Sequence, residues 1–210
     1  MERKLIIQRI ADIDSEISLV RNVLKTLEAT SFITFPIIYE RLSVEAAMHS
    51  ERITCKFRHL IYSTLNITKP ELMKKAAEAH GIEINYSDGV FSVVLPSLLP
   101  KKGKTMNSEF LTDPLYFALD DYFSVKRMER FDKCVVCFEH IYSKETPGRL
   151  IRDYDNVEAK QVLDVISAYV MVDDNGKFCA VYHSTGYSEK DCTKISVMNQ
   201  DRFIKWLAER

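Results

Sequence analysis

The sequence has no apolar run close to the roughly 20 residues that a membrane-spanning helix needs. Its first eight residues lack the continuous apolar segment and the small-residue cleavage site of a secretory signal peptide. Its five cysteines are an odd number without the spacing of a disulfide framework, which favours a reducing compartment. We therefore expect a cytoplasmic protein with no membrane segment.

An excess of charge is also missing. The chain has 29 Lys and Arg against 30 Asp and Glu, so its net charge is −1. Nucleic-acid-binding proteins usually carry a basic excess, because the neutralisation of phosphates supplies much of their affinity. Any contact with DNA must therefore come from local basic patches. A small-molecule enzyme has little support, because the sequence contains no nucleotide-binding glycine motif and no nucleophile elbow.

The composition that is present is that of an ordinary globular protein. Hydrophobic residues make up 46% of the chain and charged residues 28%, which excludes disorder as the dominant state. A length of 210 residues allows one well-buried domain with an accessory element, or two small domains.

The first 30 residues carry the clearest helical periodicity. Apolar residues recur there at alternating spacings of four and three: Ile6, Ile10, Ile13, Ile17, Val20, Leu24 and Leu27. Residues 30–36 interrupt this pattern with β-branched residues and Pro36. A second helical stretch follows over 38–65, with one stripe made of Leu42, Ala46, His49, Ile53, Phe57 and Leu60. We predict an antiparallel α-helical hairpin, or coiled-coil-like arm, over residues 1–66.

A connecting helix and linker are predicted over residues 67–84, because Thr68 and Glu71 fit a capping box and Gly81 fits a helix C-terminus. An α+β domain is predicted over residues 85–210. It begins with a β-hairpin that turns at Asp88 and Gly89. The further predicted helices cover 113–130, 155–167 and 200–210, and the further strands cover 134–142, 169–172, 178–182 and 194–198.

Four acidic residues form the most informative pattern in this domain. Asp153 and Asp155 should lie on the same side of an extended strand end, because side chains alternate along a strand. Asp173 and Asp174 follow after one helix and one strand. Converging carboxylates repel one another unless they share a cation such as Mg²⁺ or Mn²⁺, and such ions support the hydrolysis of phosphodiesters. The alternative interpretation is that these are solvated loop acids.

The wider constellation resembles that of the RusA-type Holliday junction resolvases. It consists of 152–156 with an Asp-x-Asp-Asn step into a helix, Leu163-Asp164 within the helix, and 172–174 with an Asp-Asp pair. Residues 91–96 look like the opening strand of that family and its proline. The resemblance covers about residues 85–198 and does not extend to the N-terminal arm.

The resemblance implies a RusA-like mixed sheet with packed helices and a homodimer that cuts branched DNA during recombination or repair. Asp153, Asp155 and Asp174 would be the metal-binding catalytic acids, with Asp173 beside them and Mg²⁺ or Mn²⁺ as the cofactor. Lys160 would be the basic residue of the helix. It lies one position later than the family's lysine, because Ala159 occupies that position here. Asp164 is displaced in the same sense, which favours a one-residue insertion near the start of the helix.

Basic residues near this motif are candidates for contact with DNA phosphates: Lys101, Lys102, Lys104, Arg149 and Arg152. A solvated surface is the alternative interpretation. The spacing of Cys134, Cys137 and His140 suggests zinc, but positions 134 and 137 of a strand face opposite sides, so we predict buried strand cysteines. We also predict a packing role for Tyr154 and a structural or surface position for His183.

Two function classes remain open from the sequence alone. The first is a divalent-metal-dependent, structure-selective DNA endonuclease. The second is a non-catalytic protein that keeps the same fold and uses its helical arm for oligomerisation or for binding a partner. The neutral net charge, the coiled-coil-like stripe and the displaced lysine favour the second class.

Overall fold

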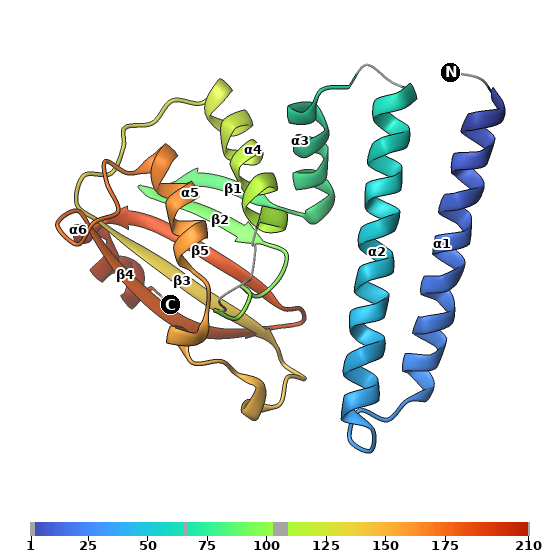
Figure 1. The fold of residues 1–210 in the computed structure, drawn as a ribbon. Helices are drawn as coiled ribbons and strands as arrows, with labels where there is room; N and C mark the ends of the chain where they lie inside the picture. The colour runs from blue at the N-terminus through green and yellow to red at the C-terminus, as the bar shows by residue number, and fades with distance from the viewer. Residues whose placement is uncertain (1–2, 65–66, 103–108, 210) are drawn as a thin grey trace. The chain divides into compact units, whose positions relative to one another are not determined.

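A computed structural model of the protein describes residues 3–64, 67–102 and 109–209. The chain forms two compact units, Met1–Thr68 and Lys69–Arg210. Within the described residues the protein is α+β, with six α-helices and one mixed five-stranded sheet, and it starts with a long helix (Figure 1). No described helix combines the length and the apolar character that crossing a membrane requires.

The first unit is a pair of long helices, α1 (Arg3–Ala29) and α2 (Pro36–Thr64). The two helices are antiparallel, because early residues of α1 contact late residues of α2. Lys56 donates a hydrogen bond to the backbone oxygen of Asp12, and Glu16 lies 2.6 Å from the ring of His49. The helical hairpin predicted from the sequence is therefore present in the described residues.

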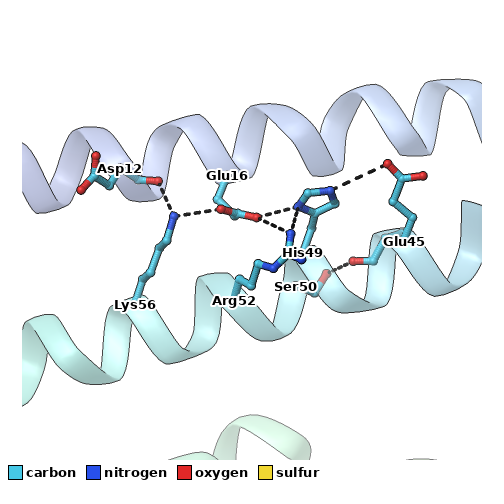
Figure 2. A network of polar contacts seen from close by, with 8 residues as sticks. Asp12, Glu16, Glu45, His49, Ser50, Arg52 and Lys56 are labelled. Carbon is cyan, nitrogen blue, oxygen red and sulfur yellow. Dashed lines mark hydrogen bonds and ion pairs between the residues drawn. The ribbon is translucent and has the colours of Figure 1, made fainter.

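The seam between these helices has a polar centre, which Figure 2 shows. Glu16 is only 8% exposed, and its carboxylate contacts His49, Arg52 and Lys56. The Lys56 ammonium lies 2.8 Å from Glu16 Oε2. Hydrogen bonds from Lys56 and then from His49 lower the pKa of Glu16 to about 2, so this carboxylate is ionised at neutral pH.

The second unit begins with α3 (Lys69–His80), which buries Met73 and Ala77 and packs against α4 (Glu109–Val125). The sequence predicts α3 as a connector, but it is part of the α+β unit. β1 (Glu83–Ser87) and β2 (Val90–Leu95) then form the predicted hairpin. Asp88 and Gly89 both have positive φ, 52° and 75°, as a type I′ hairpin turn requires.

The sheet has the strand order β1-β2-β5-β3-β4. β3 (Cys134–Ser143) pairs in parallel with β4 (Cys179–Ser188), and α5 (Lys160–Val170) lies between these two strands in the chain. β5 (Cys192–Asn199) inserts antiparallel between β2 and β3. Its insertion brings the first and last strands of the unit into one sheet.

Both faces of the sheet carry buried side chains. Apolar residues of α4 and α5, including Leu115, Leu119, Val162 and Ile166, belong to the main core with one face of the sheet. Figure 1 shows α4 and α5 in front of the sheet. On the other face, α6 (Gln200–Ala208) covers only a small cluster through Phe203 and Trp206.

Several predicted boundaries differ from the structure, and β4, predicted over 178–182, extends to Ser188. α4 runs from Glu109 to Val125 instead of 113–130. α5 begins at Lys160 and not near residue 156, because residues 154–156 form a separate 3₁₀ turn, η2 (Tyr154–Asn156). The strand predicted over 169–172 is wrong, because α5 continues to Val170 and Met171 makes only an isolated bridge to Phe131. A short apolar run that is buried fits a helix as well as a strand.

Candidate functional site

Two segments about fifty residues apart in the chain form the base of the candidate site. Glu158 N–H donates to the oxygen of Pro100, and Lys102 N–H donates to the oxygen of Asn156 at 2.8 Å. Lys101 and Val157 form an isolated antiparallel bridge between these hydrogen bonds. Because Val157 is buried in the main core, the bridge anchors the two lysines beside η2.

A cavity of about 380 Å³ opens at this junction. Its lining contains four cationic side chains and one carboxylate: Lys101, Lys102, Arg149, Arg152 and Asp153. We call it the basic pocket; Leu150, Ile151 and Asn156 complete its lining. Arg149 comes from the 3₁₀ turn η1 (Gly148–Leu150), which follows β3 after a short loop. Four of the five residues predicted to contact DNA therefore lie in one pocket, and the fifth, Lys104, lies outside the described residues.

Arg152 differs from the other cations because it is tied to the fold. Its guanidinium donates to the backbone oxygen of Leu99, and its backbone N–H donates to the Tyr142 hydroxyl at 3.0 Å. Lys101 and Lys102 are exposed, as is Arg149. These three side chains are free to meet an anion in solution, whereas Arg152 holds the wall of the pocket.

A stack of four rings joins η2 to strands β3 and β4. The rings of Tyr154, His183, His140 and Phe138 lie nearly parallel, with adjacent centroids 5.2–5.5 Å apart. The two histidines share a hydrogen bond of 3.1 Å, and the Tyr154 hydroxyl lies 3.0 Å from the Thr185 hydroxyl. The stack fixes Tyr154, and Tyr154 holds Asp153 and Asp155 on either side of it at the surface. The predicted packing role of Tyr154 is confirmed, and of the two positions predicted for His183 the structure shows the structural one.

Burial lowers the pKa of His140 to about 4, and the nearby charges of His183 and Arg152 act in the same direction. Burial also lowers the pKa of His183. Both rings are therefore neutral at pH 7, which permits their mutual hydrogen bond. Sequence reasoning considers His140 only as a zinc ligand. Strand alternation is the signal that could have placed it on the same face as Phe138 and Tyr142.

Asp153 and Asp155 are exposed, and they flank the first residue of a 3₁₀ turn. The prediction that they end an extended strand is therefore wrong, although Asp153 itself has an extended backbone. Lys160, the first residue of α5, lies 2.7 Å from Asp164 and 3.8 Å from Asp174. These two carboxylates, Asp164 first, raise the pKa of Lys160. The late start of α5 thus brings the displaced lysine to the Asp173-Asp174 turn.

The acids were also predicted to hold a divalent cation. Among the residues that the structure describes, no three His, Cys, Asp or Glu side chains are placed to hold one metal ion together. Asp174 is engaged with Lys160, and Asp153 faces the basic pocket. In the described residues these carboxylates do not form a complete ligand set by themselves.

The zinc alternative for the β3 cysteines finds no geometry to support it in the described residues. Cys134 belongs to the main core, whereas Cys137 belongs to the small cluster on the opposite face of the sheet. The interpretation of these residues as buried strand cysteines is confirmed.

Comparisons with known proteins add a family but no activity. A family model described as a family of unknown function, DUF6100, matches residues 2–210. No curated protein matches the sequence. Among solved structures, the crystal structure of a protein described as MotB like, from Desulfovibrio vulgaris, is similar with 12% identity and a TM-score of 0.32. That similarity covers 61% of this chain and 90% of the other, and at this TM-score it carries no argument.

Proposed function

This chain belongs to the DUF6100 family, and we propose that its α+β unit binds nucleic acid by holding backbone phosphates in the basic pocket. The observation that carries this proposal is the convergence of Lys101, Lys102, Arg149 and Arg152 on one cavity of about 380 Å³. Four cations from two distant segments share this pocket with one carboxylate, Asp153, which gives it a local excess of positive charge in a chain whose net charge is −1. An anionic ligand relieves their mutual repulsion.

Phosphate suits this pocket better than a carboxylate does. The three exposed cations extend from adjacent backbone segments, so they can reach successive phosphates of one strand. Base-specific contacts are not required for such binding, because electrostatic affinity is independent of sequence. We therefore expect recognition of the backbone or of DNA shape, consistent with a branched-DNA ligand.

Fluorescence anisotropy of the full chain with labelled duplex, single-stranded and four-way-junction DNA tests this function. We expect the protein to bind at least one of these ligands, with log Kd rising linearly as log salt rises, and a slope of about three. Tighter binding of the junction than of the duplex would identify a shape preference. Absence of binding to all three ligands at low salt would contradict the proposal.

A second candidate is the divalent-metal-dependent endonuclease that the resemblance to RusA-type resolvases implies. Two observations favour it. First, the Lys160 ammonium lies 3.8 Å from the Asp174 carboxylate, so two of the proposed catalytic residues are neighbours. Second, Asp153 lines the pocket that is proposed to hold DNA phosphates. Mg²⁺ is commonly held by one or two carboxylates together with substrate phosphates, so a bound DNA could complete an unfinished ligand set.

Calorimetric titration of Mg²⁺ and Mn²⁺ tests this candidate, with and without junction DNA, beside Asp155→Asn. Heat that depends on DNA and is lost in the variant, together with cleavage of the junction, would support an endonuclease. Unchanged binding of DNA with no metal heat and no cleavage would leave the non-catalytic binding function and contradict the nuclease.

A further inference from the structure

Helix α1 carries two apolar stripes, and the hairpin uses only one of them. The residues of α1 nearest to α2 recur at spacings of three and four: Ile6, Arg9, Ile13, Glu16, Val20, Val23 and Leu27, all buried or half-buried. The sequence pattern places Ile10, Ile17 and Leu24 in that stripe instead; in the structure Ile10 and Leu24 are exposed and Ile17 is half-buried. The side of α1 that faces α2 instead contains Arg9, Glu16 and Val23. The polar network around Glu16 fixes this register of the two helices.

The displaced residues form a second stripe, which we call the outer seam. Ile10, Ile17 and Leu24 recur every seventh residue, and Ile10 and Leu24 are each 52% exposed. The Asp12–Lys56 and Glu16–His49 contacts set the alignment of the two helices. In this alignment the α2 residues at the same levels as the outer seam, and on the same side of the hairpin, are Phe57, Ser50 and Ser43. Phe57 is 44% exposed, so the apolar surface continues across both helices.

The hairpin also has too small a core for its length. Among its described residues only Ile13, Val23 and Leu42 are fully buried apolar side chains. A small helical unit ordinarily gains stability by oligomerisation when its own core is this limited. Five large hydrophobic side chains of α1 remain exposed: Leu5, Ile7, Ile10, Leu19 and Leu24.

The charges beside the outer seam are self-complementary. Asp14 and Arg21 lie on the same stripe of α1, seven residues apart, and both are exposed. When two α1 helices run antiparallel with a two-fold axis at Ile17, Ile10 of each copy meets Leu24 of the other. In the same register position 14 lies level with position 20 of the other copy, so Asp14 of each copy comes within one residue of Arg21 of the other, a rise of about 1.5 Å that the long arginine side chain spans. A two-fold interface uses the same patch on both copies and requires such reciprocal pairs.

We propose that the outer seam docks against the outer seam of a second copy of this chain, α1 against α1 in antiparallel orientation, so that two hairpins form a four-helix bundle. The self-complementary order Ile10, Asp14, Ile17, Arg21, Leu24 selects a second copy over an unrelated helix. The serines at positions 43 and 50 leave room for the approach of the second hairpin.

Sedimentation equilibrium of the full chain tests the dimer, beside Ile17→Lys and the matched control Leu19→Lys. The two-fold axis brings two lysines together at position 17, so we expect the dimer Kd to rise about a hundredfold or more. Leu19 is 44% exposed but lies on the opposite flank of α1, so its variant should remain a dimer. Far-UV circular dichroism checks that both variants keep their helices.

Charge reversal separates this interface from a general loss of folding. We expect Asp14→Arg and Arg21→Asp each to weaken the dimer roughly tenfold, because each change places like charges in two symmetric pairs. The double variant D14R/R21D restores opposite pairs and should return the unmodified affinity. A monomeric unmodified chain, or a double variant no tighter than the single ones, would overturn the proposal.

Disulfide cross-linking reports the orientation of the helices. In a Cys55→Ser background, Ile17→Cys should form a covalent dimer under mild oxidation, because the symmetry axis brings the two cysteines within disulfide reach. Leu19→Cys in the same background should not. A cross-link at position 19 with none at position 17 would rule out the antiparallel outer-seam interface.

Discussion

A triple variant that replaces Lys101, Lys102 and Arg149 by alanine binds DNA about a hundredfold or more weakly than the unmodified protein at about 0.1 M salt. The reason is counterion release. Each cation that neutralises a phosphate contributes about 0.9 to the slope of log Kd against log salt, so losing three of them removes most of the salt dependence as well. Anisotropy measurements at four or five salt concentrations give both quantities.

The matched control removes the same amount of charge elsewhere. Lys133, Lys177 and Lys205 are exposed and lie outside the basic pocket, so their triple alanine variant changes the net charge by the same amount. We expect it to keep nearly all of the affinity and the slope. Equal losses in both triple variants would mean that overall charge, and not the pocket, attracts the DNA.

Arg152 is left out of that variant on purpose. Its guanidinium bonds to the Leu99 backbone, so its removal would disturb the wall of the pocket as well as its charge. Variants at the three exposed cations separate the electrostatic contribution from folding, because none of the three side chains has a hydrogen bond or ion pair described within the structure.

Acidification from pH 6.5 to pH 4 destabilises the α+β unit by about 3 kcal/mol through His140. The His140 side chain is 2% exposed, its ring packs against those of His183 and Tyr154, and the charge of Arg152 lies nearby. Its pKa falls from the ordinary 6.5 to about 4 in the folded protein. The unfolded chain therefore binds more protons below pH 6.5, so stability is complete above that pH and is lost as the pH falls toward 4.

Urea unfolding at several pH values measures this effect. Trp206 is the protein's single tryptophan and lies in the α+β unit, so its fluorescence follows this unit and not the arm. His140→Gln removes the titration of this ring and leaves that of His183, whose pKa burial also lowers, so we expect a flatter dependence between pH 6.5 and 4. The exposed His80→Gln serves as the control and should keep the full dependence. A slope that His140→Gln leaves unchanged would contradict this assignment.

The ring stack is connected to the basic pocket through Tyr154, so protonation of the stacked histidines should also change the affinity for DNA. Tyr154 stacks on both histidines, and it directly follows Asp153, which lines the basic pocket. Protonation of the stack replaces a neutral hydrogen-bonded pair by buried like charges. DNA affinity in the acidic range should therefore fall before the unit unfolds globally.

Local features of this protein were readable from the sequence. The helical arm follows from apolar periodicity, and the β1–β2 turn follows from Asp88 and Gly89, which accept positive φ. The burial of Cys134 and Cys137 on opposite faces follows from strand alternation. In each case the preference depends on a few neighbouring residues, so no knowledge of distant contacts was needed.

Tertiary structure decided the rest, because those features depend on which distant segments meet. The sequence marked Lys101 and Arg149 as basic residues, but only the 100–102 and 156–158 hydrogen bonds bring them into one pocket. Apolar periodicity placed Ile10 in the buried stripe of α1 and Glu16 outside it, whereas the structure buries Glu16 and exposes Ile10. A shift of one residue decides which stripe faces α2, and the buried charge pairs of Glu16 set that register. Apolar pattern identifies a surface that can be buried, whereas the partner that buries it is a property of the fold.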